Sequence, residues 1–193
     1  MALLQEILAR SASQHRHLCP RQVLGARIGL AAAEALGVSL PPPRRRLYVF
    51  VETDGCFADG IAAATGCTLG HRTMRLVDLG RVAATVVDLR TRRAVRAAPR
   101  PQIRQRALEV SPGARSGWHA QLDAYQRLPV EELLTVRPVA LTVALDDLLG
   151  RASARVTCAG CEEEVINGRE VVVNGRILCR ACAGDTYYHE EIA

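Results

Sequence analysis

The first third of the chain carries apolar residues at helical spacing. Apolar side chains at positions 3, 4, 7 and 8 share one face of a helix that ends near Ser13. A second helix begins at Pro20, because proline suits the first helical position, and it closes at Gly37. Further helices are predicted at residues 56–64, 101–110, 118–128, 129–134 and 146–150.

Runs of β-branched and aromatic residues predict the strands. Residues 47–53 (LYVFVET) are typical of a buried strand. Residues 74–78 and 82–89 resemble the two arms of a hairpin around Leu-Gly-Arg at 79–81. Further strands are predicted at 94–98 and 136–145. This order of helices and strands indicates an α+β fold, with helices beside an antiparallel sheet, rather than an alternating parallel one.

Composition narrows the chemistry of this domain. Apolar residues make up 49% of the 193 residues and aromatic residues only 4%, which predicts an aliphatic core. All 25 basic residues are arginine. The absence of lysine excludes Schiff-base catalysis, a pyridoxal-phosphate anchor and a Walker A loop. No Gly-x-Gly-x-x-Gly occurs either, so dinucleotide binding has no support.

The charge is unevenly divided along the chain. Residues 1–154 carry 21 arginines against 13 acids, whereas residues 155–193 carry 4 against 7. The arginines are scattered rather than striped, so solvated surface charge is favoured over a nucleic-acid interface. No stretch is long and apolar enough for a membrane helix, and residues 1–10 lack the features of a signal peptide. We therefore expect a cytoplasmic protein whose 7 cysteines are reduced or bind metal.

The strongest motif is C-x₂-C-x₁₇-C-x₂-C near the C-terminus, formed by Cys158, Cys161, Cys179 and Cys182. Two such pairs at this spacing are typical of a closed, tetrahedral zinc site. Asn174-Gly175 between valine-rich segments predicts a hairpin that returns the second pair to the first. Redox-active disulfides are the rival interpretation. The sequence thus predicts a zinc-ribbon-like finger with one structural Zn²⁺.

These patterns divide the chain into an α+β domain at 1–150, a linker at 151–155 and a zinc finger at 156–193. So short a module buries little core, and the metal should supply its folding free energy. The finger is acidic, with Glu162-Glu163-Glu164 after the first cysteine pair. Contact with phosphates needs the opposite charge, so a structural clip or a protein-binding surface is favoured over nucleic-acid binding.

A weaker constellation involves the three other cysteines. Cys19 and Cys56 each lie where a predicted helix begins, and helix N-termini lower a thiol pKa. Cys67 follows the far end of the second of these helices, and His15 and His17 alternate with Cys19. Thiolate and imidazole together suit zinc, nickel, copper or iron. The alternative is that these are buried, inert cysteines, which is favoured for Cys67 alone.

Three other features of the sequence support weaker predictions. Asp54 follows a strand and faces a helix start, so it is a candidate functional group or a simple helix cap. His71 and His119 lack partners in the sequence and are expected to be structural. Gly25 and Gly29 give one helix face without side chains. That flat face, with the few aromatic residues, predicts a homodimer.

The chain resembles the FmdE family, which is named after a component of formylmethanofuran dehydrogenase. The resemblance rests on HRHLCP at 15–20, ETDGC at 52–56, TGCTLG at 65–70, RRAVR at 92–96, and the four-cysteine tail with Tyr187-Tyr188. It implies an α+β domain, a C-terminal zinc finger and a dimer. It also implies a pocket lined by the histidine, aspartate and cysteine motifs, here His17, Cys19, Asp54, Cys56 and Cys67.

Two functions follow from these residues. The first is a metal-binding accessory protein that holds or transfers a metal or thiol-bound group for a molybdenum- or tungsten-type oxidoreductase complex, with a second metal in the N-terminal pocket. The second is an enzyme with Cys56 or Cys19 as nucleophile and His17 as base. A nucleic-acid-binding zinc protein ranks below both.

Overall fold

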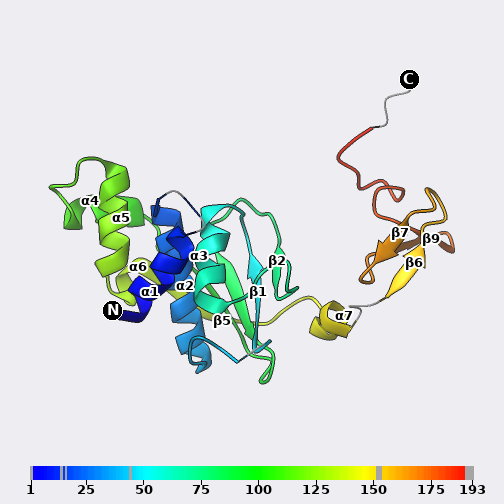
Figure 1. Ribbon diagram of the computed structural model, residues 1–193, viewed down its shortest axis with the longest axis horizontal. Helices are drawn as coiled ribbons and strands as arrows, with labels where there is room; N and C mark the ends of the chain where they lie inside the picture. Colours follow the sequence, from blue (N-terminus) through cyan, green and yellow to red (C-terminus); the bar gives the residue numbers. More distant parts are fainter. Residues whose placement is uncertain (1, 14, 16, 44, 151–153, 190–193) are drawn as a thin grey trace. The chain divides into compact units, whose positions relative to one another are not determined.

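A computed structural model describes residues 2–13, 15, 17–43, 45–150 and 154–189 (Figure 1). The chain divides into two compact units, residues 1–140 and 141–193. Helix α7 (Leu145–Gly150) therefore groups with the second unit rather than with the first. Of the predicted linker, residues 151–153 lie outside the described residues. Within the described part of the chain, no helix has the length and apolar character needed to cross a membrane.

The first unit combines helices with one sheet, which confirms the α+β class. Its helices are α1 (Ala2–Ala12), α2 (Pro20–Leu36), α3 (Cys56–Thr65), α4 (Ile103–Val110), α5 (Gly117–Arg127) and α6 (Val130–Leu133). Its strands are β1 (Leu47–Val51), β2 (Met74–Leu76), β3 (Ala84–Asp88), β4 (Ala94–Pro99) and β5 (Leu134–Val139). Gly37 ends α2 in the left-handed conformation, at φ 69°, as its glycine predicted.

The sheet is mixed rather than antiparallel throughout. Its strand order is β2-β1-β3-β4-β5, and β1 runs parallel to β2 but antiparallel to β3. The predicted hairpin between residues 74–78 and 82–89 is therefore wrong. After β2 the chain stays beside the end of β1 instead of pairing with β3. There the backbone N–H groups of Leu79 and Arg81 both donate to the carbonyl of Glu52. Helix α3 makes the crossover that a parallel pair requires.

The strand expected at 136–145 also differs. It begins two residues earlier, at Leu134, and ends at Val139, while Leu145 starts α7. Strand β5 pairs along β4 from Leu134 opposite Pro99 to Val139 opposite Ala94. The β4 register thus fixes where β5 begins and ends, which an apolar run alone does not.

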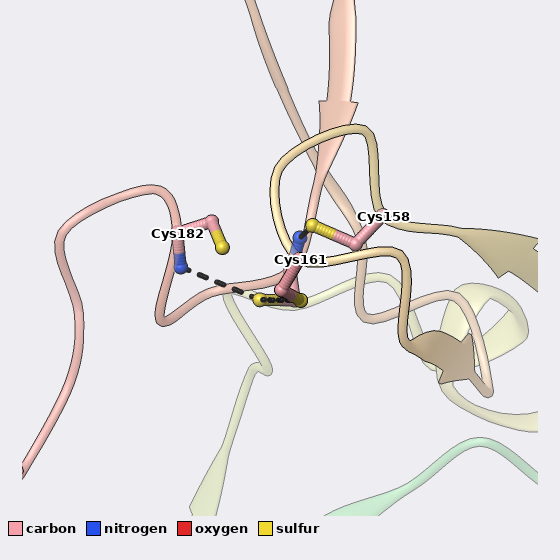
Figure 2. A group of neighbouring side chains, drawn as sticks. Cys158, Cys161 and Cys182 are labelled. Carbon is pink, nitrogen blue, oxygen red and sulfur yellow. Dashed lines mark hydrogen bonds between the residues drawn. The ribbon is translucent and has the colours of Figure 1, made fainter. Parts of the chain in front are cut away.

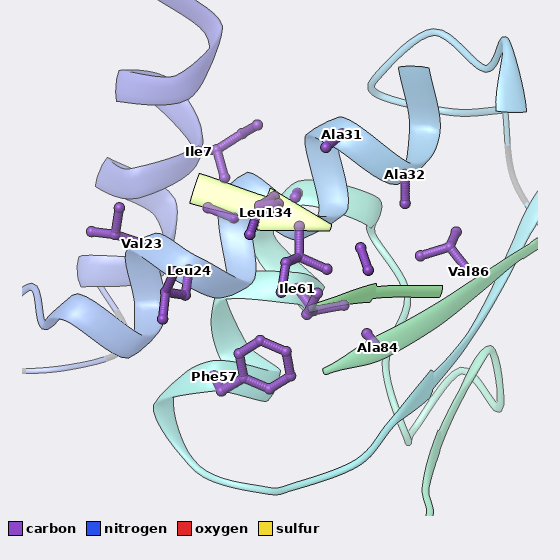
Figure 3. Packing of buried hydrophobic residues seen from close by; sticks show 14 of the residues in the cluster. Ile7, Val23, Leu24, Ala31, Ala32, Phe57, Ile61, Ala84, Val86 and Leu134 are labelled. Atoms are coloured by element: carbon purple, nitrogen blue, oxygen red, sulfur yellow. The ribbon is translucent and has the colours of Figure 1, made fainter. Parts of the chain in front are cut away.

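An aliphatic core lies between the sheet and the helices, as the composition predicted (Figure 3). Helix α2 crosses β3, β4 and β5, and α1 and α3 both pack on α2. Strands β1 and β3 are buried along their whole length. The largest fully buried side chains include Tyr125, Phe57, Ile7, Ile28 and Leu47.

Two glycines bring α2 and α3 into backbone contact. A Cβ added at Gly25 would lie 2.2 Å from the carbonyl oxygen of Phe57, and one at Gly60 would lie 2.2 Å from that of Gln22. The glycine face of α2 is thus covered by α3 of the same chain. This removes the argument that Gly25 and Gly29 leave a flat surface for a second copy, and the homodimer stays an untested prediction.

The second unit contains two small antiparallel sheets. Strands β6 (Arg155–Thr157) and β7 (Glu164–Ile166) form one, and β8 (Val171–Val173) and β9 (Arg176–Leu178) form the other. Asn174 and Gly175 connect β8 to β9 with φ values of 50° and 76°. Two successive positive φ angles are those of a type I′ turn, so the hairpin predicted from Asn-Gly is confirmed.

Candidate functional site

The four tail cysteines come together in one cluster. Figure 2 labels three of them, Cys158, Cys161 and Cys182. The Sγ atoms of Cys158, Cys161, Cys179 and Cys182 all lie within 4.8 Å of one another. The Sγ atoms of Cys161 and Cys179 are 3.9 Å apart. Tetrahedral zinc with Zn–S bonds of about 2.3 Å would separate its sulfur atoms by about 3.8 Å. The cluster therefore fits a metal ion such as zinc.

Backbone amides stabilise thiolate at this cluster. The N–H groups of Gly160 and Cys179 donate to Sγ of Cys158 over 3.3 and 3.1 Å, and that of Cys182 donates to Sγ of Cys179 over 3.3 Å. Hydrogen bonds from backbone N–H groups lower the pKa of Cys158 to about 6, and the N–H of Cys161 has the largest effect. Interactions with the other three sulfur atoms raise the pKa of Cys182 to about 12, and the sulfur of Cys179 has the largest effect. A bound cation would displace the protons that such crowded thiols retain.

The surroundings of the cluster point to a structural role for the metal. The apolar core of the second unit consists of Cys158, Val165 and Leu178, with Val156 and Cys179 packed against it. So small a core stabilises little, and a metal would replace it. Gly160, inside the first cysteine pair, packs closely on the second pair. A Cβ at this position would lie 3.0 Å from Sγ of Cys182, so a residue without a side chain suits it. Within the described residues, this is the one cluster with at least three candidate metal ligands.

A second thiol cluster forms where α2 and α3 begin. Cys19 is the N-cap of α2 and Cys56 is the first residue of α3. The Cys19 thiol is near enough to Cys56 to contribute to the raised pKa of Cys56, so the structure brings these two predicted residues together. Burial, and then the neighbouring Cys19 thiol, raise the pKa of Cys56. The expectation that helix ends lower it is not met, because desolvation of the thiolate outweighs the helix dipole.

Two further pairs hold this thiol cluster in place. Gln22, completely buried, accepts from the backbone N–H of Cys19 over 2.7 Å. Its Nε2 donates to the carbonyl and hydroxyl oxygens of Ser11, which ties the start of α2 to the end of α1. His15 lies 2.8 Å from Asp59 of α3, and Asp59 also raises the pKa of Cys56 by its charge. Gln22 and Asp59 were missing from the sequence-based site.

The other predicted site residues lie apart from these two thiols. Cys67 is at the opposite end of α3, where its Sγ donates to the carbonyl of Leu47 over 3.3 Å and burial raises its pKa. A 10-residue helix separates it from Cys56 by more than about 13 Å. The prediction that Cys67 joins Cys19 and Cys56 is therefore wrong, since its thiol occupies a core position.

His17 and Asp54 are on the surface. The ring of His17 is 6.3 Å from that of Trp118 at the start of α5, so His15 and His17 face different helices. Asp54 is exposed in the turn before α3. The N-cap of α3 is Gly55, at φ 68°, so the capping role considered for Asp54 falls to the glycine. His71 and His119 have local hydrogen-bonding partners, Thr68 and Ser116.

The buried carboxylate of this region is Glu52, two residues before Asp54. Arg96 of β4 donates to Glu52 through Nε and Nη2 over 2.6 and 2.8 Å, and Arg81 adds a contact of 2.8 Å. The Arg96 hydrogen bonds hold the pKa of Glu52 below its ordinary value. Glu52 therefore anchors the end of β1 as a paired anion rather than acting as a proton donor.

Residues 14–135 match the sequence profile of the family described as "FmdE, Molybdenum formylmethanofuran dehydrogenase operon". The chain belongs to the FmdE family. Most of the first unit lies within the match, including Cys19, Cys56 and Cys67. FmdE membership thus confirms the resemblance drawn from the sequence motifs.

Two individual proteins extend the comparison. The crystal structure of a tungsten formylmethanofuran dehydrogenase FmdE-like protein from Syntrophus aciditrophicus superimposes with a TM-score of 0.62 at 19% identity, over 96% of this chain and 95% of that one. This likeness concerns the fold alone. A probable S-adenosyl-L-methionine-binding protein of Archaeoglobus fulgidus is 36% identical over 96 residues. That match spans 48% of this chain and only 26% of the relative, so the FmdE chain covers about a quarter of it.

Proposed function

We propose that this FmdE-family protein is an accessory protein with two thiol sites of different kinds. The tail cluster would hold one structural Zn²⁺ between four thiolates. The Cys19–Cys56 pair would take up a second metal ion, or a thiol-bound group, and pass it to a molybdenum- or tungsten-type oxidoreductase. The family description and the printed name of the Syntrophus protein support this class of partner.

The observation that carries the proposal is the meeting of Cys19 and Cys56 at two adjoining helix starts. A closed site needs four protein ligands, whereas two thiols leave positions open for exchange. Reduced thiols are required for this function, so we place the protein in the cytoplasm.

Alkylation by iodoacetamide, read per cysteine by mass spectrometry, tests this proposal. The tail is first saturated with zinc, so that only body thiols respond. Because the pKa of Cys56 is raised, its labelling should accelerate as pH rises above neutrality. Added Zn²⁺ or Ni²⁺ should then slow the labelling of Cys19 and Cys56 together. In the same digest, buried Cys67 should label only after denaturation and serves as the internal control.

A matched pair of variants sharpens the result. Cys19→Ser should remove the metal protection of Cys56, whereas Cys67→Ser should leave it intact. If Cys19 and Cys56 label only in denatured protein, with no protection by metal, they are core cysteines and the proposal fails.

A cysteine-dependent enzyme is the second candidate function. The observation that favours it is the His15–Asp59 pair beside Cys56, an imidazole oriented by a carboxylate. This function requires one thiol to react much faster than the other. Equal labelling rates at Cys19 and Cys56, both suppressed by metal, would exclude it in favour of the accessory protein.

A further inference from the structure

A cavity of about 360 Å³ lies at the other end of α3, away from the Cys19–Cys56 pair. Three segments line it: residues 41–43 and 45–47, which lead into β1; residues 65–67 at the end of α3; and residues 70–73 before β2. The volume is many times the roughly 30 Å³ of one water molecule and falls in the range of small-molecule sites, about 300–1,000 Å³. All three segments belong to the first unit.

The lining of the cavity is basic. Arg45, Arg46, His71 and Arg72 contribute to it, and the described lining residues include no aspartate or glutamate. Arg46 is neutralised by Asp88, to which its Nε and Nη2 donate over 2.5 and 2.9 Å. Arg45 has no ion-pair partner among the described residues and is exposed. The cavity therefore presents the guanidinium charge of Arg45, for which the described residues supply no carboxylate.

Two arginines of the lining, Arg45 and Arg72, have an unusual backbone. Arg45 and Arg72 adopt φ values of 56° and 57°, the left-handed region that residues other than glycine, asparagine and aspartate rarely occupy. Such residues persist where the surroundings fix them, and they concentrate at ligand-binding sites. Both residues line the cavity, and they come from two different loops.

His71 and Cys67 belong to the remaining wall. Thr68 holds Nδ1 of His71 at 3.0 Å, which leaves Nε2 as the imidazole atom available to a ligand. The thiol of Cys67 is occupied by the carbonyl of Leu47. The carboxyl end of α3 adds about half a negative charge, which is less than one guanidinium supplies. The balance at the cavity stays positive.

We propose that this cavity binds a small ligand that carries a tetrahedral oxyanion, held by Arg45 and Arg72 with His71. Guanidinium forks match the oxygens of such anions in a bidentate manner. A phosphate ester on a small molecule and a free ion such as molybdate share this chemistry, and the test separates them. The site is distinct from the Cys19–Cys56 pair, because α3 places the two at its opposite ends.

Isothermal titration calorimetry on the full chain at fixed ionic strength tests the proposal. The probes are inorganic phosphate, molybdate and adenosine monophosphate, with chloride as the reference anion. The test variants are Arg45→Asn and Arg72→Asn, because asparagine tolerates the left-handed backbone while removing the charge. Arg104→Gln on α4 is the matched control, since it removes one exposed arginine that does not line the cavity.

At least one probe should bind with one equivalent per chain, and Arg45→Asn should weaken it about tenfold or more, that is about 1.4 kcal/mol. Arg104→Gln should leave the affinity within about twofold. Tighter binding of adenosine monophosphate than of phosphate would identify a phosphate ester, and preference for molybdate a free oxyanion. The proposal is overturned if no probe binds at millimolar concentration, or if Arg45→Asn and Arg104→Gln weaken binding equally. Failure of the metal-protection experiment would not affect this result, since the two sites share no residue.

Discussion

Replacement of Gly25 by alanine should separate α2 from α3. The new Cβ would lie 2.2 Å from the carbonyl oxygen of Phe57, 2.9 Å from the backbone nitrogen of Ile61 and 3.0 Å from Cα of Gly60. Ordinary C···O contacts are about 3.3–3.6 Å, so the helices must move apart by about 1 Å. The atoms met are backbone atoms, which cannot rotate out of the way.

The free energy of unfolding should fall by about 2 kcal/mol. Overpacking of a core costs about 1–3 kcal/mol, and backbone contacts on both sides place this site at the upper end. Alanine recovers about 1 kcal/mol through its higher helix propensity. For a chain of 193 residues, each kcal/mol shifts Tm by about 2–4 °C, so Tm should drop by about 4–8 °C.

Circular dichroism at 222 nm against temperature measures this change. Gly113→Ala is the control, because its added Cβ meets nothing within 4 Å, and it should change Tm by less than about 2 °C. Gly25→Ala should also weaken metal protection of Cys56, since Cys19 begins the helix that moves. A Gly25→Ala protein that melts at the wild-type Tm would refute the reasoning on α2–α3 packing.

Three further outcomes follow from the structure. Removal of the tail metal by EDTA should unfold the small second unit but leave the main thermal transition, which belongs to the first unit. Loss of that whole transition when the tail zinc is removed would contradict this expectation. Arg96 lowers the pKa of Glu52 in the folded protein. The ion pair of Glu52 therefore contributes fully to the free energy of unfolding above the ordinary pKa of 4.5, and this contribution is lost as pH falls through the folded pKa. Glu52→Gln should lower the free energy of unfolding by about 1–3 kcal/mol at pH 7 and show a smaller further loss on acidification, measured by urea unfolding; equal acid sensitivity of both proteins would count against the pairing. Leu76, Val77 and Leu79 at and after edge strand β2 are exposed, so sedimentation should show a dimer that Leu79→Glu dissociates; a 20.9 kDa monomer at micromolar concentration would end that expectation.

Local signals in the sequence were sufficient for several elements. Pro20 and Gly37 predicted both ends of α2, because each favours the backbone that its position requires. Asn174-Gly175 predicted the tail hairpin for the same reason. The spacing of the four tail cysteines predicted their cluster, since two short pairs and one hairpin leave little freedom.

Non-local pairing could not be read in this way. Strand β2 has only three residues, so its sequence does not select between a hairpin with β3 and a parallel pair with β1. The contact of His15 with Asp59 joins residues 44 positions apart, and no spacing rule covers it. The error over Cys67 was avoidable, because the length of the predicted helix already set it far from Cys56.

The separation of a closed tail site from an exchangeable dithiol site is tested most directly by counting metal ions. Native mass spectrometry of the reduced full chain, saturated with Zn²⁺, reports the number bound per chain. Two ions are expected for the wild type and for Cys67→Ser, and one for Cys19→Ser, with the remaining ion lost on Cys179→Ser. A single ion in the wild type, unchanged by Cys19→Ser and lost with Cys179→Ser, would contradict metal binding by the Cys19–Cys56 pair.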